Sequence, residues 1–109
     1  MSNYVFIESR DPFDSPDTSF LADTAISLKK RGNSVTVFLV QNGVLAARKQ
    51  ARKTHLPQLL ESGATVLADD FSLRERGIQS DECQNPITTA SIDQLVDLLV
   101  QENTKAVWH

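Results

Sequence analysis

Two adjacent carboxylates, Asp69 and Asp70, follow directly after the short apolar run at residues 65–68. Ligands and chemistry in open α/β sheets sit at the carboxyl ends of the strands. Adjacent carboxylates at such an end could bind a divalent cation or act as acid and base. Neighbouring residues on a strand point to opposite faces, so at most one of the two would reach a cleft. The alternative interpretation is a solvated strand end that caps the next helix.

The chain has one cysteine, Cys83, which excludes an intramolecular disulfide and a zinc site made of cysteines alone. Cys83 lies in a polar segment, and the acidic neighbours Asp81 and Glu82 would raise its pKa. We therefore predict a surface thiol without a task. His55 and His109 are not spaced as a metal pair, and the sequence has no phosphate-binding loop and no Ser-His-Asp pattern. No metal and no cofactor is predicted.

Basic residues recur at helical spacing at Arg48, Lys49, Arg52 and Lys53. One basic helical face could contact RNA, a phosphate or an acidic partner, or it could simply be solvated. No aromatic residues are interleaved for base stacking, and the net charge of −3 favours neither nucleic acid nor an anionic membrane. The sequence shows no signal peptide and no apolar run long enough to span a bilayer, so we expect a cytoplasmic protein.

Apolar runs alternate with segments of helical periodicity, which predicts a single α/β domain over residues 1–109. It would be a three-layer domain, with a mostly parallel sheet of four to five strands and helices on both faces. Ser15 and Pro16 predict the start of the first helix, and the pattern from Ser91 to Gln94 predicts a capping box. We expect Trp108 to pack against a helix. Strands are predicted at residues 4–7, 35–40, 65–68, 87–89 and 105–108, and helices at 15–31, 44–62, 71–76 and 91–100.

Four segments, in this order, resemble the DsrE/DsrF/DsrH-like family, which includes the TusB, TusC and TusD sulfur-relay proteins. They are an acidic, proline-containing loop after the first strand, Val-Phe-Leu-Val-Gln-Asn-Gly-Val at 37–44, Leu-Arg-Glu-Arg-Gly-Ile at 73–78, and the last helix and strand at 91–108. The acidic segment at 68–71 and the terminal tryptophan are most similar to the DsrH/TusB-like branch. The resemblance implies a parallel α/β sheet, assembly into oligomers, and persulfide transfer through a cysteine in the active members.

The resemblance also implies where that cysteine would lie. Counted back from Gly77, the family's cysteine positions fall on Asp69 and Ser72, and residues 19–25 lack the cysteine of the DsrH-type first helix. A carboxylate cannot carry sulfane sulfur, which argues against an enzyme. The first hypothesis is therefore a non-catalytic subunit. It would form homo-oligomers or hetero-oligomers with DsrE-like subunits, or contact a sulfur-carrier protein. Its expected ligand- or partner-binding residues are Asn42, Gly43, Asp69, Asp70 and Ser72.

Two alternatives stay open. The first is a sulfurtransferase that carries a persulfide on Cys83, delivered by a mobile loop. The second is a metal-assisted activity at Asp69 and Asp70.

Overall fold

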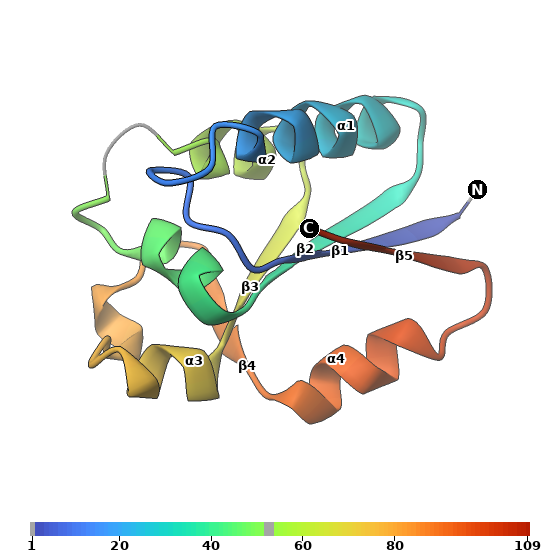
Figure 1. Ribbon diagram of the computed structural model, residues 1–109. Helices are drawn as coiled ribbons and strands as arrows, with labels where there is room; N and C mark the ends of the chain where they lie inside the picture. The colour runs from blue at the N-terminus through green and yellow to red at the C-terminus, as the bar shows by residue number, and fades with distance from the viewer. Residues whose placement is uncertain (1, 52–53) are drawn as a thin grey trace.

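A five-stranded parallel sheet forms the centre of the chain (Figure 1). The computed structural model describes residues 2–51 and 54–109. The strands lie in the order β4-β3-β2-β1-β5, and all four neighbouring pairs run parallel. The strands are β1 (Asn3–Glu8), β2 (Ser34–Leu39), β3 (Thr65–Asp69), β4 (Thr88–Ala90) and β5 (Thr104–Trp108). The predicted parallel α/β sheet is confirmed.

Helices cover both faces of this sheet. In Figure 1, α1 and α2 lie above the sheet and α4 lies below it. The helical segments are α1 (Thr18–Lys30), η1 (Gln41–Ala47), α2 (Leu56–Glu61), α3 (Asp70–Glu75), η2 (Ser80–Glu82) and α4 (Ile92–Leu99). The capping box predicted at Ser91 is confirmed, because Ser91 Oγ accepts from the backbone N–H of Gln94 and the Gln94 side chain accepts from the N–H of Ser91. None of the helices in the described ranges is long and apolar enough to cross a bilayer.

The alternation of side chains along each strand separates the core into two clusters. On the face of α1 and α2, Phe6 and Val37 pack with Leu21 and Leu59. On the opposite face, the buried residues are Val5, Ile7, Phe38, Val40, Ala90 and Leu95. The helical residues of the second cluster, Leu95, Leu98 and Leu99, all come from α4.

The first helix starts later than its sequence predicts. Its first residue is Thr18 and its N-cap is Asp17, whose side chain makes no capping hydrogen bond. The preceding loop forms its own turn around Asp11, whose carboxylate accepts from the N–H of Phe13 and whose carbonyl accepts from the N–H of Ser15. This turn uses the backbone around Ser15, and the helix begins only after it.

The predicted basic helical face is wrong in the part that the structure describes. The segment after β2 forms the short 3-10 helix η1, and Arg48 beyond it is extended. Arg48 pairs with Cys83 in an antiparallel bridge, and the N–H of Lys49 donates to the carbonyl of Glu82. This pairing between distant segments overrides the local helical propensity. Arg52 and Lys53 lie outside the described residues.

The first strand of the chain, β1, and the last, β5, lie side by side in the sheet. From β1 to β4 each new strand is added on the same side, whereas β5 returns to the other side of β1. The direction in which strands are added therefore reverses after β4, and the point of reversal in the sheet lies between β1 and β5. In open α/β sheets, the crevice at such a reversal is where ligands bind.

Candidate functional site

Polar residues collect at the carboxyl edge of the sheet, directly at the ends of four neighbouring strands. Glu8 ends β1, Gln41 and Asn42 follow β2, Asp69 ends β3, and His109 follows β5. Because the strands are parallel, all these residues come to one edge of the sheet. They form two separate groups, one around Asp69 and one around His109.

The first group joins β3, α3 and the segment after β2. Asp69 is the N-cap of α3, and its carboxylate accepts from the backbone N–H of Ser72 at 3.0 Å and from the Ser72 hydroxyl at 2.6 Å. The same hydroxyl oxygen accepts from the backbone N–H of Gln41 at 2.8 Å. Asp69 and Ser72 are both buried. The carboxylate therefore fastens the start of α3 to the end of β2.

The remaining predicted site residues lie around this network. Asn42 is held by Arg76, whose Nε and Nη2 donate to the Asn42 side-chain oxygen at 3.2 and 3.0 Å. Asp70 forms an exposed ion pair with Arg74 at 3.7 Å. Gly43 lies so close to the backbone of β1 that a Cβ atom added there would stand 2.2 Å from the carbonyl oxygen of Glu8. Ligand or partner binding by these residues stays a prediction.

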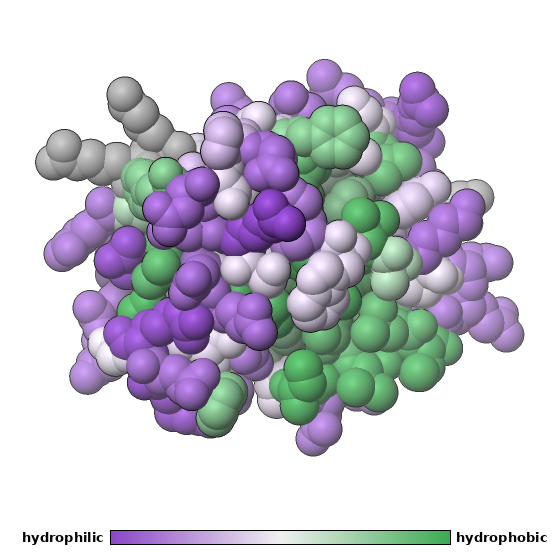
Figure 2. Space-filling view, viewed as in Figure 1, coloured by the Kyte–Doolittle hydropathy of each residue, from purple (hydrophilic) through white to green (hydrophobic). Residues whose placement is uncertain are grey.

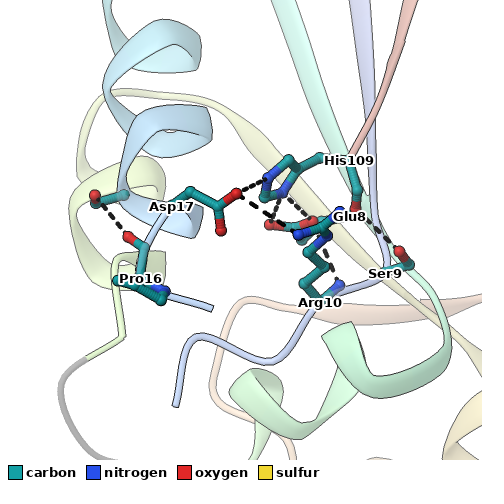
Figure 3. Close-up of polar contacts among 7 residues, drawn as sticks. Glu8, Ser9, Arg10, Pro16, Asp17 and His109 are labelled. Atoms are coloured by element: carbon teal, nitrogen blue, oxygen red, sulfur yellow. Dashed lines mark hydrogen bonds and ion pairs between the residues drawn. The ribbon is translucent and has the colours of Figure 1, made fainter. Parts of the chain in front are cut away.

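The second group is centred on His109 and joins β1, β5 and the start of α1 (Figure 3). Its Nδ1 lies 2.9 and 2.8 Å from the two carboxylate oxygens of Glu8, and its Nε2 lies 3.2 Å from Asp17 Oδ2. Arg10 lies 3.6 Å from the same Asp17 oxygen. Backbone pairing extends past β5, because the N–H of His109 donates to the Ile7 carbonyl and the N–H of Ser9 donates to the His109 carbonyl.

Both ring nitrogens of His109 face carboxylates, and two N–H donors exist only in the imidazolium form. Burial alone would lower the pKa of His109, but hydrogen bonds and charge from Glu8 and Asp17 outweigh it and raise the pKa above the usual 6.5. Burial raises the pKa of Glu8 above 4.5, although His109 opposes this effect. The hydrogen bond with His109 lowers the pKa of Asp17. The two carboxylates thus favour the protonated form of His109.

We predict that the free energy of unfolding falls by about 1 kcal/mol above neutral pH because of His109. Because the pKa of His109 is raised in the folded state, protonation of His109 stabilises the fold fully below the unfolded pKa of 6.5. This stabilisation is lost as the pH rises through the folded pKa. Urea unfolding at a series of pH values from 6 upward measures the change. His109→Gln should remove this part of the pH dependence, and an unchanged profile in that variant would contradict the prediction.

A small cavity lies beside this group, between α1, α2 and the sheet. Its polar lining residues include Glu8, Arg10 and Thr18, and its wall is mainly aliphatic. The apolar lining consists of Pro12, Leu21, Ala22, Val37, Leu39, Ala46, Leu56 and Leu59. The cavity volume is about 30 Å³. A space of this size holds about one water molecule.

The predicted surface position of Cys83 is wrong. Cys83 is 5% exposed and belongs to the core cluster on the α1 and α2 face. Its backbone pairs with Arg48, and the next residue, Gln84, donates to the Ala47 carbonyl. Burial raises the pKa of the thiol, and the charges of Glu82 and Asp81 add to the increase, against a smaller opposing effect of Lys49. The predicted direction of this pKa shift is confirmed, although burial is its main cause.

A model of the DsrE/DsrF-like family matches residues 2–105. The chain belongs to this family. No curated protein matches it. A protein of unknown function, MTH1491 from Methanobacterium thermoautotrophicum, has the same fold, with 17% identity over the full length of both chains and a TM-score of 0.83. The ychN protein from E. coli is 15% identical over both full chains, with a TM-score of 0.88.

A third similar structure is the conserved protein of unknown function BT1422 from Bacteroides thetaiotaomicron. It is 21% identical and has a TM-score of 0.78, and the match covers 99% of this chain and 95% of the other. At these identities the three structures show a shared fold, and they carry no argument about activity.

Sequence reasoning missed the second polar group of this DsrE/DsrF-like chain. Glu8 and His109 each stand directly after a predicted strand, which is the same signal that drew attention to Asp69. What the sequence does not display is the pairing of β1 with β5, which brings residues 8 and 109 together. Within residues 2–51 and 54–109, no three His, Cys, Asp or Glu side chains are arranged to hold a metal ion.

Proposed function

We propose that this DsrE/DsrF-like chain is a non-catalytic, cytoplasmic subunit of the DsrH/TusB-like branch. It would act by assembling with DsrE-like subunits or by contacting a sulfur-carrier protein. The observation that carries the proposal is the hydrogen bonding of the Asp69 carboxylate. Its carboxylate stands where the family resemblance expects a sulfur carrier, and its hydrogen bonds to the N–H and hydroxyl of Ser72 give it a structural task.

The cavity beside Glu8 is too small for a metabolite, whereas an open groove of about 320 Å³ lies beside Asp70 and Arg74. Ligand pockets for small molecules measure about 300–1,000 Å³. The cavity beside Glu8 measures about 30 Å³. A partner surface would instead contact the exposed carboxyl edge, where the side chains of Asn42 and Asp70 are accessible beside Arg76 and Arg74. This mixture of an amide, a carboxylate and two guanidinium groups suits a polar protein surface.

The state of the thiol supports the same proposal. Sulfur transfer requires a thiolate that attacks the outer sulfur of a donor persulfide, forms a new S–S bond and releases the donor as a thiol. Burial and the neighbouring carboxylates of Asp81 and Glu82 disfavour that thiolate at Cys83. The backbone of Cys83 pairs with Arg48. Asn42 bonds to Arg76 and Ser72 bonds to Asp69, so the thiol and these two predicted site residues take part in different contacts.

The test is a mass measurement after exposure of the purified chain to a mild persulfide donor. We expect the intact mass to stay unchanged under conditions that load a sulfur carrier of the same family, included as the positive control. A gain of one sulfur atom that is lost in Cys83→Ser would overturn the proposal in favour of a carrier acting through Cys83. Isolation of the chain from native lysate, with intact-mass analysis, would identify its partner.

A further inference from the structure

The two edge strands of the sheet are protected to different degrees. The sheet ends at β4 on one side and at β5 on the other. An edge strand leaves backbone groups without a partner, and proteins protect such edges with very short strands, proline or charged side chains. β4 has three residues and follows Pro86 closely, whereas β5 has five residues, no proline and a single charge at Lys105. β5 is therefore the less protected edge.

The hydrogen bonds between β1 and β5 show which backbone groups of β5 have no partner. The N–H of Asn3 donates to the carbonyl of Asn103, and the N–H of His109 donates to the carbonyl of Ile7. In a parallel pair, residues that bond to the neighbouring strand alternate with residues whose backbone groups point away from it. The residues of β5 that point away from β1 are Thr104, Ala106 and Trp108. No hydrogen bond within the described part of the chain uses their three N–H and three C=O groups.

The side chains beside this edge are also open to solvent. Val5 and Ile7 of β1 are buried in the α4 cluster, so β1 is covered on that face. Trp108 pairs with Ile7 and shares its face, but Trp108 is 66% exposed. The predicted packing of Trp108 against a helix is therefore wrong. On the opposite face Val107 is 40% exposed. The helices thus leave both faces of β5 accessible.

The two faces of β5 differ in their chemistry. On the face of α4, the side chains of β5 include Ala106 and Trp108. Figure 2 shows hydrophobic side chains gathered at the lower right, over the position of α4, which lies below β5 in Figure 1. On the opposite face, the Nζ of Lys105 lies 5.7 Å from the centre of the Tyr4 ring. A segment added to this edge would therefore meet apolar side chains on one face and a positive charge on the other.

We propose that β5 accepts an extended segment of a partner protein as an added strand, antiparallel to β5. A strand is the element that offers donors and acceptors at the spacing of the free groups on β5. In an antiparallel pair, a partner residue opposite Trp108 or Ala106 lies on the face of α4, and a residue opposite Lys105 lies on the other face. The segment therefore carries apolar residues at alternate positions and an acidic residue opposite Lys105.

The probe for this contact is the acetylated and amidated peptide Val-Thr-Val-Glu-Val, whose glutamate lies opposite Lys105 when its third residue lies opposite Ala106. Titration to about 5 mM makes a Kd near 1 mM measurable. We expect the amide proton signals of Thr104, Ala106 and Trp108 to move downfield, because their N–H groups gain acceptors. Those of Lys105 and Val107 should move less, since these N–H groups already point toward β1. Unshifted signals along β5 at this concentration would overturn the inference.

Ala106→Pro tests the backbone pairing directly. It removes an N–H that points away from β1 and keeps the bonds of the neighbouring residues to β1. We expect it to weaken binding of the probe by roughly 10-fold or more, because one hydrogen bond is lost and the proline ring obstructs the edge. Ala106→Val is the matched control, which keeps the N–H and should bind as the wild type does. Far-UV circular dichroism establishes that both variants are folded.

A second pair of measurements needs no proline variant. N-methylation of the third residue of the probe removes the reciprocal donor, and equal affinity of the methylated and plain peptides would contradict strand addition. Lys105→Glu should bind Val-Thr-Val-Lys-Val more tightly than the glutamate peptide, the reverse of the wild-type order.

Light scattering identifies the other possible occupant, a second copy of the chain. A wild-type dimer that Ala106→Pro dissociates would place a second copy on this edge and overturn the inference. The contact on β5 is separate from the carboxyl edge that the proposed function uses, so this inference goes beyond that function. Persulfide loading of the chain would overturn only the proposed function, because β5 contains no cysteine.

Discussion

Gly43→Ala should destabilise the fold by about 3 kcal/mol, the upper end of the usual cost of overpacking. A Cβ atom at Gly43 would stand 2.2 Å from the carbonyl oxygen of Glu8 and 3.1 Å from its carbonyl carbon. Both atoms are backbone of β1, so no side-chain rotation relieves the clash. Either η1 moves away from β1, or Glu8 moves away from His109. Urea unfolding followed by circular dichroism measures the loss.

Gly32→Ala is the matched control for this substitution. Gly32 has a φ of +89°, and an added Cβ there meets nothing within 4 Å. Its cost is therefore that of the backbone conformation, about 1 kcal/mol, without a clash against another segment. If Gly43→Ala cost no more than Gly32→Ala, the close approach of η1 to β1 would be contradicted.

Asp69→Ala should also cost about 3 kcal/mol, for a different reason. The substitution removes the N-cap of α3, worth about 1 kcal/mol, and leaves the buried hydroxyl of Ser72 without its acceptor, which costs about 1–3 kcal/mol more. Asp69→Asn should recover part of the loss, because an amide oxygen can still accept from Ser72. Chemical denaturation of the three proteins gives the comparison.

The adjacent acid supplies the control for Asp69. Asp70 makes only an exposed ion pair with Arg74 at 3.7 Å, so Asp70→Ala should cost about 0.5 kcal/mol or less. Equal costs for Asp69→Ala and Asp70→Ala would contradict the structural role of Asp69. A large difference would support the proposal that its carboxylate replaces sulfur chemistry with a fold-stabilising contact.

Local patterns predicted most of the secondary structure. Apolar runs with β-branched residues marked the strands, and the Ser91 and Gln94 capping box marked the start of α4. These signals are readable because each depends on residues within one or two turns of the chain. The predictions failed where distant segments compete for the same backbone, as when Arg48 pairs with Cys83 rather than continuing a helix.

For the candidate site, local sequence patterns were enough to predict which polar residues end each strand, and the family resemblance set Asp69 where a sulfur carrier would be. The tertiary structure decided which of them meet. It brought Gln41 to the hydroxyl of Ser72 beside Asp69, and it joined Glu8 to His109 across 101 residues of separation. It also buried Cys83 and exposed Trp108. The physical reason is that burial and pairing depend on strand order, which is set by packing between elements far apart in the chain and not by local residue types.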